Sequence, residues 1–238
     1  MSDHASGVLA ELPTASISDA LDKLGLTGSV HGISPLRPGQ RACGPAYTVA
    51  YEPVDDQGGT VGDFLDDVPA GSVVFIDNAG RTDCTVWGGI MTQVAAHKHV
   101  AGTVINGVCR DVAVTTTTDY RIWSAGRFMR TGKDRVRVRA VQEPLHVDGV
   151  TIRPGDVICA DEDGVVVVPA ERADEVVAVA TEVERVEAAI VATVRDGATL
   201  REARSTHGYY SLQTPNAAPH AASDTAATAP ATVAGDTA

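Results

Sequence analysis

The sequence predicts an α/β fold built around a mixed β-sheet, and three observations support this prediction. Apolar segments at 72–77 and 165–168 are bounded by turn residues, which is typical of buried strands. Residues 135–141 (RVRVRAV) alternate between charged and apolar side chains, as an exposed strand does. Residues 171–194 have the spacing of a long amphipathic helix with Glu and Arg on its outer face. Strands therefore dominate the middle of the chain and a long helix follows them, which argues against a regular strand–helix series.

The other elements follow from periodicity and turn residues. We expect a short helix at 14–24, with Ser16 or Ser18 as its capping residue. The further predicted elements are strands at 46–51, 103–105, 147–152 and 157–160 and helices at 64–68 and 90–98. The pair Asn106-Gly107 is predicted to turn the chain after the strand that precedes it.

The composition predicts one domain and a tail. Residues 1–213 contain enough apolar side chains for a single α/β domain. Residues 214–238 consist largely of Ala, Thr and Pro, without aromatic side chains or periodicity. Such a segment cannot bury enough apolar surface to offset the entropy lost on ordering, so we expect it to be disordered.

The charge and the apolar pattern exclude several classes of function. The net charge is −12, and no run of Lys and Arg offers a surface for nucleic acid. No apolar stretch approaches the roughly 18 residues of a membrane helix, and the start does not resemble a secretory signal. The four cysteines are far apart and form no CxxC pair, so we interpret them as core residues. These features predict a cytoplasmic protein without a nucleic-acid or membrane partner.

The most informative segment for chemistry runs from Gly88 to Asp111. Gly88 and Gly89 precede a predicted helix, whose first backbone amides are unpaired and open to a carboxylate. Arg110 can hold a carboxylate or enolate oxygen, and Asp111 is a hard oxygen ligand suited to Mg²⁺ or Mn²⁺. The alternative is that Arg110-Asp111 is an ordinary surface dipeptide, which the dipeptide alone would favour.

Two further charged segments allow alternatives. The segment Arg127–Arg135 carries four cations, Arg127, Arg130, Lys133 and Arg135, which either receive a second substrate carboxylate or flank a solvated strand. The acidic turn at 161–164 is too short for a calcium loop, and we favour a structural turn.

Five segments in this order carry a resemblance to a known family: TASISDALDKLG, HGISPLRPGQRACGPAYTV, GSVVFIDNAGRTDCTVWGG, AGTVINGVCRDV and RPGDVICADEDGVVVVP. Together they resemble the RraA-like family, named after regulator of ribonuclease activity A. That family includes the 4-hydroxy-4-methyl-2-oxoglutarate / 4-carboxy-4-hydroxy-2-oxoadipate aldolases. The resemblance covers residues 14–212, and the segments at 107–111 and 154–169 are its most specific parts.

The resemblance implies a fold, an assembly and a site. The fold would be an α/β sandwich resembling the swivelling phosphohistidine domain, assembled as a homotrimer or homohexamer with active sites between subunits. Asp111 would bind the divalent metal, Arg110 the pyruvate enolate, and the backbone amides of Gly88, Gly89, Ile90 and Met91 the substrate carboxylate. A glutamate from the neighbouring subunit would approach the metal-bound water, with Glu187 as its counterpart and Glu184 as the alternative.

One position departs from the aldolase pattern. The aldolases have an aspartate where this chain has Gly89, so a carboxylate that orders metal-bound water is missing, and Asp77 or Asp83 is a candidate replacement. The expected function is a metal-dependent carbon–carbon lyase that cleaves a 4-hydroxy-2-oxo acid to pyruvate, with oxaloacetate decarboxylation as a related activity. The alternatives are a non-catalytic regulator of a ribonuclease and a relative recruited to another lyase or tailoring reaction.

Overall fold

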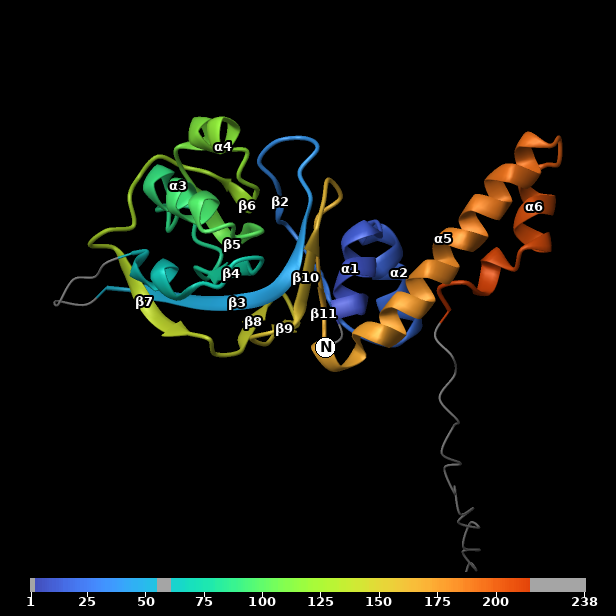
Figure 1. The fold of residues 1–238 in the computed structure, drawn as a ribbon, viewed down its shortest axis with the longest axis horizontal. Coiled ribbons are helices and arrows are strands. Elements are labelled where there is room, and N and C mark those ends of the chain that lie inside the picture. Colours follow the sequence, from blue (N-terminus) through green and yellow to red (C-terminus); the bar gives the residue numbers. More distant parts are fainter. Residues whose placement is uncertain (1–2, 55–60, 215–238) are drawn as a thin grey trace, which may run out of the picture.

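The computed structural model describes residues 3–54 and 61–214, and it shows a long curved sheet with two separate groups of helices (Figure 1). Helices α3 (Gly89–His97) and α4 (Val112–Thr118) lie over one end of the sheet. Helices α1 (Asp3–Glu11), α2 (Thr14–Lys23) and α5 (Ala173–Arg195) lie at the other end. Among the described residues, no helix is both long enough and apolar enough to cross a membrane.

The main sheet has nine strands, and its order is β1-β11-β10-β3-β4-β5-β6-β2 with β7 attached to β3. The strands are β1 (Ser29–Val30), β2 (Ser34–Pro35), β3 (Ala42–Pro53), β4 (Val73–Asp77), β5 (Gly102–Cys109), β6 (Ile122–Arg127), β7 (Val136–Val141), β10 (Val157–Ala160) and β11 (Val165–Val168). Strands β3 to β6 are parallel, and the remaining pairs are antiparallel. The prediction of an α/β fold with a mixed sheet is confirmed.

Strand β3 connects the two ends of the molecule. Its residues 42–45 pair with β10, residues 46–50 with β4, and residues 49–53 with β7. Strand β3 is curved along its length (Figure 1), and its pairing with β7 has a register shift between Ala50 and Tyr51. The sheet therefore curls instead of lying flat, and the likeness to the swivelling phosphohistidine domain stays a prediction.

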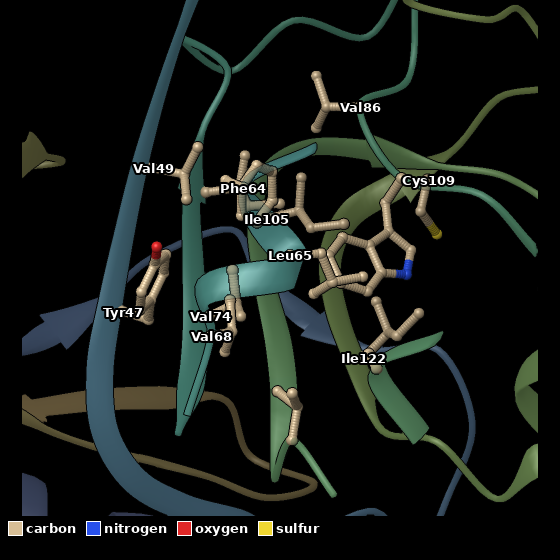
Figure 2. Close-up of a cluster of buried hydrophobic side chains, with 14 of the residues drawn as sticks. Tyr47, Val49, Phe64, Leu65, Val68, Val74, Val86, Ile105, Cys109 and Ile122 are labelled. Carbon is tan, nitrogen blue, oxygen red and sulfur yellow. The ribbon is translucent and has the colours of Figure 1, made fainter. Parts of the chain in front are cut away.

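Three apolar clusters hold these layers together. The first lies between the parallel strands and the segment around the 3₁₀ helix η1 (Asp63–Asp67), whose Phe64 and Leu65 cover the sheet (Figure 2). The second lies near the hairpin of β8 (Leu145–Val147) and β9 (Val150–Ile152), whose side chains are part of it. The third joins α1, α2 and α5 to β10 and β11. The remaining described helices are α6 (Leu200–Thr206), η2 (Ala170–Arg172) and η3 (Tyr209–Ser211).

The segment that leads to Arg110 differs from the prediction. Asn106-Gly107 does not turn the chain, because β5 continues to Cys109 with a register shift between Ile105 and Val108. Gly107 has a φ of +150°, a backbone conformation that glycine adopts without steric penalty. The strand β6 and the helices α1, α4 and α6 were not predicted, and 147–152 is a hairpin instead of one strand. Because β5 is longer than predicted, Arg110 lies just beyond its carboxyl end, at the edge of the sheet where the parallel strands end.

The start of α2 is capped from a distance, not by its own serines. Ser16 donates to Glu184 and Ser18 bonds to Ser29, so the prediction of a local serine cap is wrong. Instead, the carboxylate of Asp161 accepts the Thr14 amide at 2.8 Å and the Thr14 hydroxyl at 2.5 Å. The acidic turn at 161–164 therefore has the structural role that was favoured.

The predicted tail at 214–238 lies, from residue 215 onward, outside the described residues. The described chain to residue 213 includes the short helices α6 and η3, which follow α5. The division into one domain and a disordered tail stays a prediction.

Candidate functional site

A pocket of about 220 Å³ lies where the chain leaves β5 and where α3 begins. Its lining includes all six residues that the sequence and the resemblance placed together: Gly88, Gly89, Ile90, Met91, Arg110 and Asp111. The parallel strands β4, β5 and β6 point their carboxyl ends toward this edge of the sheet. Ligands of parallel α/β sheets typically bind at that edge.

The loop before α3 is fixed by the buried hydroxyl of Thr85. This hydroxyl donates to the Val108 carbonyl at 2.8 Å and lies 2.9 Å from the Trp87 carbonyl and 3.2 Å from the Trp87 amide. The Trp87 carbonyl in turn accepts the Arg110 amide at 3.1 Å. Thr85 therefore connects the glycine turn to β5 and to the backbone of Arg110.

The first turn of α3 offers open backbone amides. The indole of Trp87, stacked on Tyr120 at 6.1 Å, donates to Thr92, and this contact fixes the helix start. Among the described residues, the amides of Ile90 and Met91 have no hydrogen-bond acceptor. They lie at the N-terminus of α3, which is the positive end of the helix dipole and favours a carboxylate.

Asp111 has an unusual backbone and an anchored carboxylate. Its φ is +58° and its ψ is +38°, a left-handed conformation that aspartate tolerates better than most residues. Its Oδ2 accepts the Gly89 amide at 2.8 Å, so it satisfies the first amide of α3. Its Oδ1 has no hydrogen bond or ion pair to any described residue, and the side chain is 48% exposed. One oxygen is thus structural and the other is available to a ligand.

Arg110 lies beside this carboxylate. Its Nε is 3.7 Å from Asp111 Oδ2, a long ion pair between two partly exposed side chains. Such a pair contributes little to stability, typically below about 1 kcal/mol. The guanidinium can therefore turn toward a bound anion without a large loss of folding energy.

The two glycines leave space for this pair. A Cβ at Gly88 would lie 3.0 Å from Asp111 Oδ2 and 3.1 Å from Arg110 Nε. A Cβ at Gly89 would lie 3.2 Å from a Val114 methyl and 3.3 Å from Asp111 Cβ. Both positions have a φ that other residues adopt, so space for the neighbouring side chains favours glycine here.

The cations of the Arg127–Arg135 segment do not line the pocket in the described structure. Arg127 donates to the Leu36 carbonyl, and Arg135 donates to the carbonyls of Thr131 and Lys133. Arg130 lies over the Phe128 ring at 5.7 Å. From this segment, Thr131 is the residue that lines the pocket.

The predicted glutamates and replacement carboxylates are not in the pocket. Glu187 and Glu184 lie on α5, which is on the far side of β10 from α3 (Figure 1). Burial, and then the charges of Glu184 and Asp19, raise the pKa of Glu187. Asp77 accepts a hydrogen bond from the side-chain amide of Asn106 at 2.8 Å, and Asp83 forms an ion pair with Arg81 at 2.8 Å. Arg81 holds the pKa of Asp83 below its usual value.

The pocket offers one carboxylate to a metal. Among the described residues, no group of three or more His, Cys, Asp or Glu side chains could hold a metal ion. Zinc, which takes three or four side-chain ligands, does not fit such a site. Mg²⁺ keeps several waters and takes one or two carboxylates, so the available Oδ1 of Asp111 fits an ion of this kind.

Sequence reasoning did not identify Thr85, Trp87, Thr131 and Val61 as pocket residues. Thr85 meets Val108 and Thr131 through isolated parallel bridges between segments far apart in the chain. No spacing within the sequence predicts such a meeting. The signal that was present, a β-branched residue before the Trp87-Gly88-Gly89 turn, is too common to mark a site.

Comparison with known proteins places this geometry in context. DlpA of Legionella pneumophila is 41% identical over 199 residues, 82% of this chain, which spans about a third (32%) of DlpA. A Halalkalibacterium halodurans protein named "Putative 4-hydroxy-4-methyl-2-oxoglutarate aldolase" is 34% identical over 66% of this chain and 73% of that protein. A solved structure of an uncharacterized protein from Pseudomonas syringae has a TM-score of 0.80 at 45% identity, covering 86% of this chain and 98% of that one.

A second solved structure is described as Streptomyces coelicolor RraAS2, an unusual member of the RNase ES inhibitor RraA protein family. It has a TM-score of 0.73 at 27% identity and covers 79% of this chain and 95% of that one. The family model "RraA-like: Aldolase/RraA" matches residues 14–167, which include the whole glycine turn and the Arg110-Asp111 pair. This chain therefore belongs to the RraA-like family, in agreement with the resemblance seen in its sequence.

Proposed function

We propose that this protein is a metal-dependent carbon–carbon lyase that cleaves a 4-hydroxy-2-oxo acid and releases pyruvate. The observation that carries the proposal is the meeting, in one pocket, of Arg110, Asp111 and the open amides of Ile90 and Met91. The names of three relatives as putative aldolases support a lyase, and these three names do not mention a metal. Decarboxylation of oxaloacetate passes through the same enolate and is a related activity of this site.

The pocket can bind and orient a 2-oxo acid through its own groups. The amides of Ile90 and Met91 receive the substrate carboxylate, because they are unpaired and lie at a helix N-terminus. Arg110 lies beside that position and donates to the 2-oxo oxygen. As carbon–carbon cleavage places negative charge on this oxygen, the contact with Arg110 strengthens and lowers the barrier.

We further propose that Asp111 Oδ1 holds Mg²⁺ or Mn²⁺ together with water. When bound, such an ion supplies Lewis-acid polarisation of the oxo group. Asp111 Oδ2 meanwhile stays on the Gly89 amide, which holds the carboxylate at the start of α3. No histidine or lysine lines the described pocket, so a water molecule moves the protons.

We also propose a homotrimer or homohexamer in which Glu187 of one subunit approaches the pocket of the next. Two features support this assembly: Glu187 is remote from the pocket of its own chain, and Ile90 at the pocket is 81% exposed. A subunit contact at the pocket would bury this side chain and gain stability from its burial. Light scattering should give three or six times the subunit mass, and a monomer at micromolar concentration would contradict the assembly.

We propose a cytoplasmic location, which suits the free thiols of the described cysteines.

The test of function is a turnover screen of 4-hydroxy-2-oxo acids and oxaloacetate with Mg²⁺ or Mn²⁺. Two variants separate the proposed roles. Arg110→Ala should lower kcat about 10²- to 10³-fold, and excess metal should not restore it. Asp111→Asn keeps an oxygen for the Gly89 amide and loses the charge, so metal affinity should fall and excess Mn²⁺ should partly restore turnover.

Arg110→Lys is the matched control, because it keeps the charge, loses the planar fork and should recover only part of the activity. A chelator should abolish wild-type turnover reversibly. Persistence of turnover in chelator, or wild-type turnover in both Arg110→Ala and Asp111→Asn, would show that the proposed mechanism is wrong.

A non-catalytic regulator of a ribonuclease is the second candidate function. The observation that favours it is the single carboxylate of the described pocket, with Gly89 where the aldolases have aspartate. A stoichiometric ribonuclease complex in a pulldown, together with no turnover in the screen, would support this alternative.

A further inference from the structure

The cysteines Cys43 and Cys159 lie directly opposite each other in the sheet. Cys43 is in β3 and Cys159 in β10, and these strands pair antiparallel with Cys159 in register with Cys43. Side chains of directly opposed residues point to the same face of a sheet. Both cysteines indeed contact the cluster formed by α1, α2 and α5. The two thiols are therefore neighbours, although 116 positions separate them in the chain (159 − 43).

The hydrogen-bond pattern shows which kind of antiparallel pair they form. The Ala46 amide donates to the carbonyl of Asp156, its opposite residue, so Ala46 belongs to a hydrogen-bonded pair. Such pairs alternate with non-hydrogen-bonded ones along the strand. Pro45, opposite Val157, has no amide hydrogen and fits the second type. Cys43 lies two positions before Pro45, so Cys43 and Cys159 form a non-hydrogen-bonded pair.

This pair type brings two sulfur atoms within bonding reach. Opposed Cα atoms in non-hydrogen-bonded pairs are about 4.5 Å apart, and a disulfide accepts Cα separations of about 4.4–6.8 Å. The typical separation for this pair type is at the short end of that range, so a bond between the two sulfurs would carry some strain. Strained disulfides have higher reduction potentials and are readily reduced.

The surroundings distinguish the two thiols. Cys159 is 2% exposed and its thiol lies 3.7 Å from the Leu9 carbonyl, whereas Cys43 is half-buried. Hydrogen bonding with Cys43, followed by burial, raises the pKa of Cys159, and the nearby Arg41 opposes this rise. Cys43 is thus the sulfur that a small oxidant meets first, and Cys159 is the protonated partner beside it.

We propose that Cys43 and Cys159 are a redox modification site, forming a reversible disulfide between β3 and β10 when the protein meets a peroxide. Peroxide oxidises the Cys43 thiol to a sulfenic acid and is reduced to water. The Cys159 sulfur then attacks the Cys43 sulfur, the S–O bond breaks, and a second water leaves with the Cys159 proton. A dithiol reductant returns both thiols.

The other two cysteines provide internal controls. Cys84 belongs to the apolar cluster under α3, and Cys109 lies 3.8 Å from Ser124 Oγ. Both are buried, and neither has a cysteine in register with it in the described strand pairs. They should remain thiols when Cys43 and Cys159 are oxidised.

The experiment treats the full-length reduced protein with a small excess of hydrogen peroxide and counts its thiols after denaturation. Wild type should fall from four thiols to two and yield a tryptic peptide pair linked between Cys43 and Cys159. The Cys84→Ala control should give the same linked pair, whereas Cys43→Ala should give none. Because the bond closes a long loop, the oxidised wild type should also melt roughly 5 °C higher, and dithiothreitol should reverse this.

Three results would overturn the proposal. One is unchanged thiols under peroxide that fully oxidises a free model thiol. Another is a link that involves Cys84, Cys109 or a second chain. The third is a Cys43–Cys159 link with a lowered melting temperature, because the native register would then not accommodate the bond.

Discussion

The pocket end and the helical end of this molecule are built by different means. At the pocket end, glycines, a left-handed aspartate and unpaired amides surround a cavity of about 220 Å³. At the helical end, α1, α2 and α5 pack a continuous apolar cluster against β10 and β11. The pocket end therefore depends on backbone geometry and close approach, while the helical end depends on buried apolar area.

This difference predicts how each end responds to substitution. A small change at the pocket end should alter ligand binding with little change in stability, because its groups are partly exposed and weakly paired. A comparable change at the helical end should alter stability and leave the pocket of the same chain intact. The glutamate Glu187 is the exception, since it lies at the helical end and is proposed to act in a neighbouring pocket.

Among the substitutions that compare the two ends, the largest effect is expected for Gly88→Ala. The new Cβ would displace the side chains of Asp111 and Arg110, which lie 3.0 and 3.1 Å from its position. Displacing reacting groups by an ångström can lower activity about 10²-fold, and we expect a loss of roughly 10- to 100-fold in kcat/KM. Gly7→Ala is the matched control, because Gly7 lies in α1 with open space around it. Equal kinetics for Gly88→Ala and wild type would show that the close approach is unimportant.

The second effect concerns stability at the helical end. Asp161→Ala removes the acceptor of the Thr14 amide and hydroxyl, so unfolding free energy should fall by about 1–2 kcal/mol. Urea denaturation measures this loss, and metal affinity should not change. Asp161→Asn keeps an oxygen acceptor and should lose less. If Asp161→Ala reduced the free energy of metal binding by more than the free energy of unfolding, the two ends would not respond independently.

The third prediction concerns Gly89→Asp, which adds the carboxylate that the resemblance to the aldolases implies at this position. Its Cβ would contact Val114 and Asp111 at 3.2–3.3 Å, and two carboxylates would then repel each other. Without metal, the melting temperature should fall by a few degrees, and saturating Mn²⁺ should recover it. Gly89→Asn has the same shape without the charge and should not respond to Mn²⁺. Calorimetric titration should show tighter Mn²⁺ binding for the aspartate variant, and unchanged affinity would count against a metal at Asp111.

The smallest effect on stability is expected for Glu187→Gln. Burial and the charges of Glu184 and Asp19 raise the pKa of Glu187, so ionised Glu187 is unfavourable in the folded chain. The penalty develops as pH rises through its pKa, so the glutamine variant should melt about 1–2 °C higher at pH 7. Below the ordinary pKa of glutamate the difference should vanish. If turnover falls while stability rises, the residue serves function, and unchanged turnover would exclude its proposed role.

The sequence predicted which residues meet at the pocket better than it predicted the path of the chain that leads there, and the roles of these residues stay a prediction. Arg110, Asp111 and the glycine turn were identifiable because their segments carry a family pattern, and they do meet in the pocket. The extension of β5 through Gly107 was not predictable, since Asn-Gly is a strong turn signal and only the neighbouring strands override it. The capping of Thr14 by Asp161 also depends on contacts between distant segments. Arg127 and Arg135 donate to backbone carbonyls and do not line the pocket, and no pattern of side chains in the sequence reveals these partners.

The pairing of β1 with β11 sets the order in which this chain can complete its fold. Ser29 is in register with Val166, and α2, which packs against α5, is synthesised more than a hundred residues before its partner. During translation, the apolar face of α2 stays exposed until β10, β11 and α5 have left the ribosome. We therefore expect the helical end to complete its packing last, although α1 and α2 are made before the strands, and we expect chaperones to have their longest opportunity to bind there.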